Sequence, residues 1–116
     1  MRIASTRNAE HYVWAEACDG WRLLDDPALS VIQERVPPGK SEHTHRHAWA
    51  RQFFYILEGR AEMCCAGETL VLERGQGVEV PPGVAHQFRN PFDCEVVFLV
   101  ISSPSTRGDR EDLPAA

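Results

Sequence analysis

Two stretches of this 116-residue chain decide its fold: GKSEHTHRHAWARQFFYILEG at residues 39–59 and GQGVEVPPGVAHQFRN at residues 75–90. Both consist of short apolar or alternating runs bounded by glycine and proline, which is typical of β-strands joined by tight turns. In the first stretch His45 and His47 flank Arg46, so on an extended strand both imidazoles project from one face. The two stretches therefore predict strands, and one of these strands carries paired histidines.

The rest of the chain repeats this punctuation, with turn signals about every 8 to 12 residues, as in a sandwich or barrel. We predict strands over Leu29–Val36, Gln52–Leu57, Ala61–Cys65, Thr69–Leu72, Val78–Val80, His86–Arg89 and Glu95–Ile101. Residues 11–17 are the one stretch for which we predict a helical turn. The sequence as a whole predicts an all-β domain.

Composition limits the function classes. A chain of 116 residues makes one domain, and its formal net charge of −5 argues against nucleic-acid binding. The longest apolar runs are too short to cross a membrane, and the N-terminus has no apolar secretion signal. We therefore expect a cytoplasmic protein that contacts neither nucleic acid nor membrane, and whose four cysteines are free thiols.

A third histidine, His86, follows a Pro-Pro-Gly turn about forty residues after the first pair. Two imidazoles from one strand and one from another can converge on a metal ion at about 2.1 Å each. His43 shares the parity of His45 but lies about 13 Å from His47 along an extended strand, too far to join the same ion. Spacing alone leaves open a second interpretation, in which these are exposed loop histidines.

The same residues resemble the two motifs of the cupin family. Gly39, His45, His47, Gln52 and Gly59 follow the first motif, Gly-x5-His-x-His-x3-4-Glu-x6-Gly, except that glutamine stands at the glutamate position. The second motif, Gly-x5-Pro-x-Gly-x2-His-x3-Asn, is matched in full by Gly75, Pro81, Gly83, His86 and Asn90. The resemblance implies a small cupin barrel, also called a double-stranded β-helix or jelly roll. We place one cupin domain at residues 1–104. Beyond Ser102 the composition changes to Ser, Pro, Gly and charged residues, so we expect an extended or disordered tail at 105–116.

In cupins the motif positions hold a metal ion, so the resemblance implies a site made of His45, His47, Gln52 and His86. Glu58 lies about 20 Å along the strand from Gln52 and cannot replace the missing carboxylate. Glu42 and Glu62 are not at motif positions. Four uncharged donors would leave a divalent Fe, Mn, Ni or Zn ion with its full charge, which favours an anionic ligand. The alternative is that Gln52 only hydrogen-bonds a water molecule while three histidines bind the metal.

The family resemblance does not select one reaction. We expect a metal-binding cupin that takes a small anionic or enolisable organic ligand, with dioxygenase chemistry as the leading activity and a non-catalytic binding or sensory role as the alternative. A sugar isomerase or epimerase is a weaker alternative, because it needs an acid and a base that the sequence does not place. Strand parity makes Phe54, Ile56 and Phe88 candidate cavity-lining residues.

The runs 53–57 and 96–101 are apolar on both faces. A strand with two apolar faces needs cover on its outer side as well. We therefore expect a homodimer that buries the outward residues of one of these strands.

Overall fold

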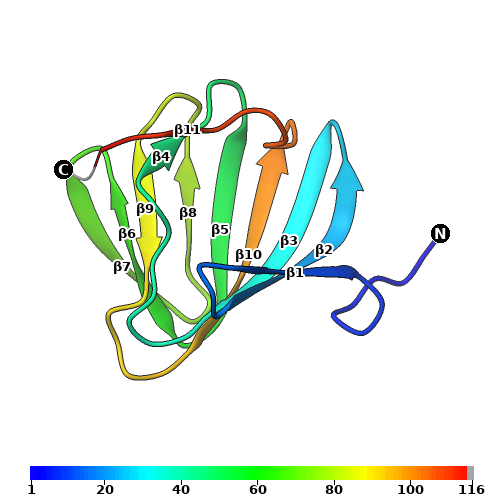
Figure 1. Ribbon diagram of the computed structural model, residues 1–116, viewed down its shortest axis with the longest axis horizontal. Helices are drawn as coiled ribbons and strands as arrows, with labels where there is room; N and C mark the ends of the chain where they lie inside the picture. The colour runs from blue at the N-terminus through cyan, green and yellow to red at the C-terminus, as the bar shows by residue number, and fades with distance from the viewer. Residues whose placement is uncertain (115–116) are drawn as a thin grey trace.

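The computed structural model describes residues 1–114 and consists of strands and turns. Figure 1 shows the strands arranged as two facing sheets. The strands are β1 (Glu10–Trp14), β2 (Cys18–Asp26), β3 (Leu29–Val36), β4 (His45–Arg46), β5 (Arg51–Glu58), β6 (Arg60–Cys65), β7 (Glu68–Glu73), β8 (Gly77–Val80), β9 (His86–Arg89), β10 (Val96–Ser103) and β11 (Glu111–Asp112). The all-β prediction is confirmed, and Leu29–Val36 and His86–Arg89 are strands with the predicted bounds.

Both sheets are antiparallel, in the orders β1-β2-β3-β10-β5-β8 and β11-β4-β9-β6-β7. Successive strands often belong to different sheets, because β4 and β9 lie in the smaller sheet and β5 and β10 in the larger one. The core between the sheets includes Phe54, Ile56, Phe88 and Phe98, and the Phe88 and Phe98 rings stack with centroids 4.0 Å apart. This is the jelly-roll architecture that the sequence predicts.

The turn between β5 and β6 shows why the first motif ends in glycine. Gly59 has a φ of 77°, and a Cβ atom there would lie 2.3 Å from the carbonyl oxygen of Glu95. A larger residue would therefore meet both backbone strain and a clash.

The second motif ends in Asn90, whose side-chain amide donates to the carbonyls of Val36 and Cys94. These motif residues hold the strand ends together and leave the histidines free for another role.

The N-terminal region differs from the prediction. The helical turn predicted over residues 11–17 is wrong, because these residues form β1 and a tight turn into β2, with Trp14 paired to Cys18. Ala15 and Glu16 have positive φ values of 46° and 69°, which reverse the chain. The local sequence is compatible with a helical turn, but pairing with β2 gives the backbone N–H and C=O groups of this segment more hydrogen-bond partners.

The chain after β10 returns to the domain. Residues 105–114, expected to be extended or disordered, contain a turn at residues 107–108 and then the short strand β11, in which Glu111 pairs with Arg46 and Asp112 with His45. Residues 115 and 116 of this tail lie outside the described part of the chain. Among the described residues no helix is long and apolar enough to span a membrane, and all four cysteines are free thiols.

Candidate metal centre

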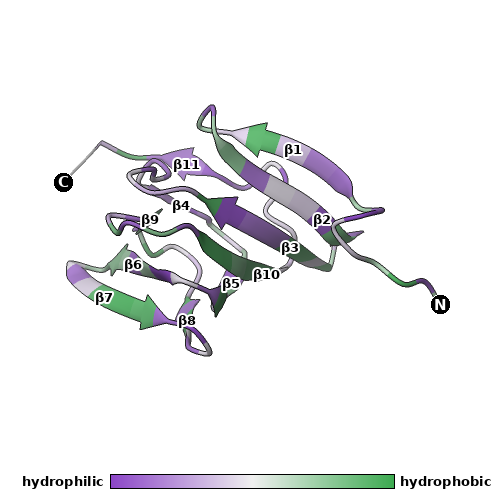
Figure 2. Cartoon of the chain, turned by 90° about the horizontal axis from the view of Figure 1, so that it is seen from below, coloured by the Kyte–Doolittle hydropathy of each residue, from purple (hydrophilic) through white to green (hydrophobic). Residues whose placement is uncertain are grey.

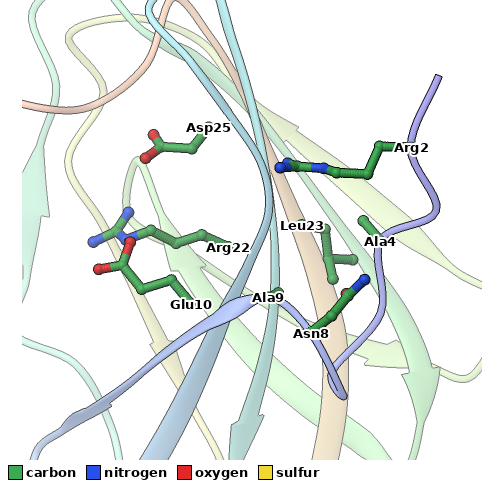
Figure 3. Close-up of a pocket in the computed structure, with 8 residues that line it drawn as sticks. All are labelled: Arg2, Ala4, Asn8, Ala9, Glu10, Arg22, Leu23 and Asp25. Carbon is green, nitrogen blue, oxygen red and sulfur yellow. The ribbon is translucent and has the colours of Figure 1, made fainter.

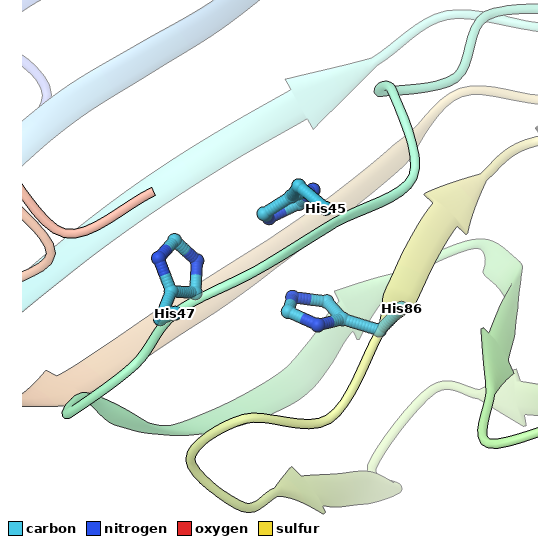
Figure 4. A group of neighbouring side chains, drawn as sticks. All are labelled: His45, His47 and His86. Atoms are coloured by element: carbon cyan, nitrogen blue, oxygen red, sulfur yellow. The ribbon is translucent and has the colours of Figure 1, made fainter. Parts of the chain in front are cut away.

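The three predicted histidines meet at one end of the barrel. His45 on β4 stands directly opposite His86 on β9, and His47 follows two residues later on the same face. One ring nitrogen from each histidine lies within 4.8 Å of one nitrogen from each of the others, and all three residues are buried. Figure 4 shows the three rings gathered from two separate segments. His43 is not part of the cluster, as the strand spacing predicted.

Hydrogen bonds fix how the imidazoles face this cluster. Nδ1 of His45 donates to the carbonyl of His43 at 2.7 Å, and Nδ1 of His86 donates to the carbonyl of Val84 at 3.0 Å. Nδ1 of His47 donates to the carbonyl of Asp109. Since a neutral imidazole carries one proton, each Nε2 keeps a lone pair. Such backbone contacts are the usual supports of metal-binding histidines.

Burial disfavours protonation of two of these histidines, His45 and His86. Burial, reinforced by the neighbouring imidazoles, lowers the pKa of His45 to about 3. Burial also lowers the pKa of His86, and its Nε2 is buried without a hydrogen-bond partner in the described chain. Neutral imidazoles with free lone pairs are the form that binds a metal, so the donor set fits a divalent ion.

Gln52 is the second residue of β5, in the opposite sheet, and it lines the same cavity. Its amide Nε2 donates to the Ser102 hydroxyl at 3.1 Å, which directs its Oε1 away from Ser102. This Oε1 is buried and has no hydrogen-bond partner within residues 1–114. An unpartnered buried oxygen is costly, and a cation or a bound water would satisfy it.

Asp109 belongs to the C-terminal segment but supports the first motif. Its carboxylate accepts the backbone N–H groups of Ala48, Trp49 and Ala50 at 2.6, 3.1 and 3.0 Å. Burial opposes ionisation, but these three N–H donors hold the pKa of Asp109 below its ordinary value. Asp109 thus shapes the turn between His47 and β5. Sequence reasoning missed this residue, because its partners lie about sixty positions earlier.

His45 and His47 line a cavity of about 550 Å³. Its other lining residues include Tyr12, Glu34, Glu42, Gln52 and Phe54. Of the candidate lining residues, Phe54 faces this cavity. Ile56 and Phe88 pack instead in the hydrophobic core, with 0% and 1% of their surface exposed. Strand parity distinguishes the inner face from the outer one, but it does not show which inner residues are covered by the opposite sheet.

The cavity also contains an acid–base pair that the sequence analysis did not place. The Tyr12 hydroxyl donates to Glu34 Oε2 at 2.8 Å. Gly20 lies between them in the sheet, paired to Tyr12 on one side and to Glu34 on the other. A Cβ atom at Gly20 would lie 2.2 Å from Tyr12 Cζ. The absence of a side chain at Gly20 therefore leaves room for the Tyr12 ring to pass over β2 and reach Glu34. Desolvation raises the pKa of Glu34 to about 7, although Tyr12 and Arg22 oppose the shift.

A second carboxylate, Glu42, reaches the histidine cluster itself. Its Oε2 lies 3.9 Å from Nε2 of His45, and its Oε1 accepts the backbone N–H of Phe88 at 3.0 Å. Desolvation raises the pKa of Glu42 to about 8. The motif positions gave no reason to expect a carboxylate here, because the segment between β3 and β4 is irregular and strand parity does not apply to it.

A smaller pocket of about 220 Å³ lies between the N-terminal segment of the chain and strand β2 of the larger sheet. Figure 3 shows charged side chains around it, including Arg2, Glu10, Arg22 and Asp25. Opposite charges alternate there, and Arg22 Nε lies 3.6 Å from Glu10 Oε1. None of the clustered histidines lines this pocket, so we place the functional site in the larger cavity.

Comparison with known protein families agrees with this geometry. The sequence model of the cupin domain family matches residues 32–102 of this chain. This range covers both motifs and every strand from β4 to β9. The chain belongs to the cupin family. This cupin is 37% identical over 67 residues to the polyketide synthase CurC of Streptomyces cyaneus, and 35% identical over 60 residues to the protein SchB of Streptomyces halstedii. The matches cover 58% and 52% of this cupin but only 44% of each relative, so the chain spans less than half of their length.

Solved structures share the fold at low sequence identity. The polyketide cyclase RemF of Streptomyces resistomycificus superposes with a TM-score of 0.84 at 19% identity, over 100% of this cupin and 87% of RemF. An RmlC-like cupin of Shewanella frigidimarina gives a TM-score of 0.83 at 20% identity, over 93% and 95% of the two chains. KdgF of a Halomonas species gives 0.82 at 16% identity, over 90% and 94%. These likenesses establish the RmlC-like cupin fold.

Proposed function

We propose that this cupin binds a divalent transition metal, namely Fe, Mn, Ni or Zn, through His45, His47, His86 and Gln52. The observation that carries the proposal is that each of the three clustered imidazoles is anchored to a backbone carbonyl through Nδ1, which leaves its Nε2 for a metal ion. The partnerless oxygen of Gln52 supports a fourth position, with direct ligation preferred over contact through a water. A bound ion would act as a Lewis acid toward an oxygen of the ligand.

The ligand we propose is a small anionic or enolisable organic molecule, and the leading reaction is oxidative cleavage. The four proposed donors are uncharged, so a divalent ion among them attracts an anion strongly at low dielectric. The cavity adds apolar contacts from Phe54 and Val100 next to polar groups. The names of CurC and RemF refer to polyketides, whose repeated carbonyls make them enolisable. This shared chemistry supports the ligand class.

A specific observation favours a second candidate, an isomerase or epimerase. Such an enzyme needs a proton donor and a proton acceptor in the cavity, and Tyr12 and Glu34 provide a paired hydroxyl and carboxylate there. A carboxyl group whose pKa is raised to about 7 exchanges protons readily near neutral pH. In this reaction Glu34 would accept a proton from carbon and return it to the same or a neighbouring carbon.

Metal analysis of the purified protein is the first test, with His86→Ala as the metal-free control. Oxygen uptake with diketones, thiols and catechols then tests oxidative cleavage, and deuterium incorporation into hydroxy ketones tests isomerisation. We expect oxygen uptake by the metal-loaded protein and none by His86→Ala. A loaded protein that binds these compounds but converts none of them is a non-catalytic binding or sensory cupin.

We further propose a homodimer formed through the outer face of the larger sheet. Phe53 and Tyr55 on β5 are 41% and 36% exposed on this face, and Ile101 on β10 lies beside Phe53. Figure 2 shows β10 as hydrophobic over most of its length. Light scattering at micromolar concentration should give twice the chain mass. Phe53→Asp should halve that mass, whereas Val71→Asp on exposed β7 should leave it unchanged. A wild-type monomer would contradict the proposal.

A further inference from the structure

Glu42 is held in a fixed position beside the metal centre by the strand that carries His86. The backbone N–H of Glu42 donates to the Phe88 carbonyl at 3.1 Å, and Glu42 Oε1 accepts the Phe88 N–H at 3.0 Å. The side chain is 15% exposed, and the residue lines the same cavity as His45 and His47. With Oε1 bound to the backbone, Oε2 is the oxygen left to face the cluster.

The contact between Glu42 and His45 lacks a shared proton. Glu42 Oε2 lies 3.9 Å from His45 Nε2, while the ring proton of His45 is on Nδ1 and donates to His43. An oxygen of the Glu42 carboxyl group and the lone pair of His45 Nε2 therefore face each other across a gap too long for a hydrogen bond. A cation bound between or beside these two atoms would attract both of them, and it would displace any proton on the carboxyl group.

The distance between Glu42 Oε2 and His45 Nε2 is compatible with two ligands of one metal ion. Two ligands that each lie about 2.1 Å from one ion are at most about 4.2 Å apart. The 3.9 Å between Oε2 and Nε2 falls within this limit. A small rotation of Glu42, or one bridging water, brings its negative charge onto an ion bound by the histidines.

We propose that Glu42 supplies the negative charge of the metal centre, in place of the carboxylate that the first motif lacks at Gln52. This inference rests on the proposed metal site and names a further residue of it. One carboxylate reduces the charge of a divalent centre from +2 to +1. The remaining charge still favours an anionic ligand, but it matches a singly charged one.

Metal binding by the full chain tests this inference, with Zn²⁺ or Co²⁺ as the probe in competition with a coloured chelator. Glu42→Gln keeps the shape of the side chain and its acceptor for Phe88, but removes the charge. We expect its dissociation constant for either ion to rise about 10- to 100-fold. Glu62→Gln is the matched control, because Glu62 is 20% exposed and pairs with Arg89. This control should bind metal as the wild type does.

A second variant tests the charge separately from the fold. The double variant Glu42→Gln/Gln52→Glu returns the carboxylate to the motif position, and we expect it to regain most of the lost affinity. The Co²⁺ visible spectrum should change in Glu42→Gln and not in Glu62→Gln. Unchanged affinity in Glu42→Gln, or a double variant that binds no better than the single one, would overturn the role of Glu42.

The His86→Ala variant separates this inference from the proposed function. If His86→Ala loses the metal while Glu42→Gln keeps it, the histidine centre stands and only the role of Glu42 fails. If His86→Ala binds Zn²⁺ as tightly as the wild type, the proposed metal site itself is wrong.

Discussion

Replacing Asp109 by alanine should destabilise the whole domain, although Asp109 lies in the C-terminal segment. Its carboxylate accepts three backbone N–H groups in the turn that follows His47. Hydrogen bonds to a charged group contribute about 1.5 to 3 kcal/mol each. Ala48 and Trp49 are exposed, so in the variant water can accept hydrogen bonds from their backbone N–H groups. Ala50 is buried, with 1% of its surface exposed, so its N–H group would be left without a partner. We therefore expect a net loss of about 2 to 4 kcal/mol.

Urea and thermal unfolding of the metal-free protein measure this loss. For a domain of this size, 2 to 4 kcal/mol corresponds to a Tm lower by about 8 to 16 °C. Zn²⁺ affinity should also fall, because displacement of the segment removes the carbonyl that fixes the ring of His47. Asp112→Ala is the control, since Asp112 makes an exposed ion pair with Arg110 and should leave the Tm unchanged. A Tm for Asp109→Ala within 2 °C of the control would refute the reasoning, as roughly half a kcal/mol would then be at stake.

Three further predictions concern the cavity. His86→Ala should lose nearly all bound metal in elemental analysis, whereas His43→Ala should retain it, because His43 is outside the cluster; equal retention would contradict the ligand set. Gly20→Ala should displace the Tyr12 phenol and cost about 1 to 2 kcal/mol in urea unfolding, whereas an unchanged value would show that the ring adapts. Glu34 has a folded pKa of about 7 against an ordinary 4.5, so the folded state binds more protons between these values. The wild type should therefore lose about 1 to 2 kcal/mol relative to Glu34→Gln as the pH rises from 4.5 to 7, and a constant difference in urea unfolding would argue against the shift.

The alternation of charge and burial on β4 illustrates what local sequence can predict. The side chains of His45 and His47 are buried and face the cavity, and Arg46 between them is exposed and pairs with Glu111. Strand geometry imposes this two-residue period whatever the rest of the fold does. The same period correctly placed Gln52 and Phe54 on the inner face of β5.

Residues outside regular strands were harder to predict. Glu42 lies in an irregular segment, so its side-chain direction follows from its hydrogen bonds to Phe88 rather than from a period. The pairing of Tyr12 with Glu34 depends on two strand registers and on the absence of a side chain at Gly20. The helical-turn prediction for residues 11–17 failed for a related reason, since β2 supplies the partner that makes this segment a strand.

The sequence by itself determined the all-β class, the cupin motifs and the set of three histidines, because turn residues and a two-residue period act over short distances. Only the tertiary structure decided what surrounds that set: Glu42 beside His45, Tyr12 on Glu34, and Asp109 beneath the turn after His47. Each of these contacts joins segments that only the packing of separate strands brings together, or depends on an irregular backbone. Contacts of this kind leave no periodic signal in the chain.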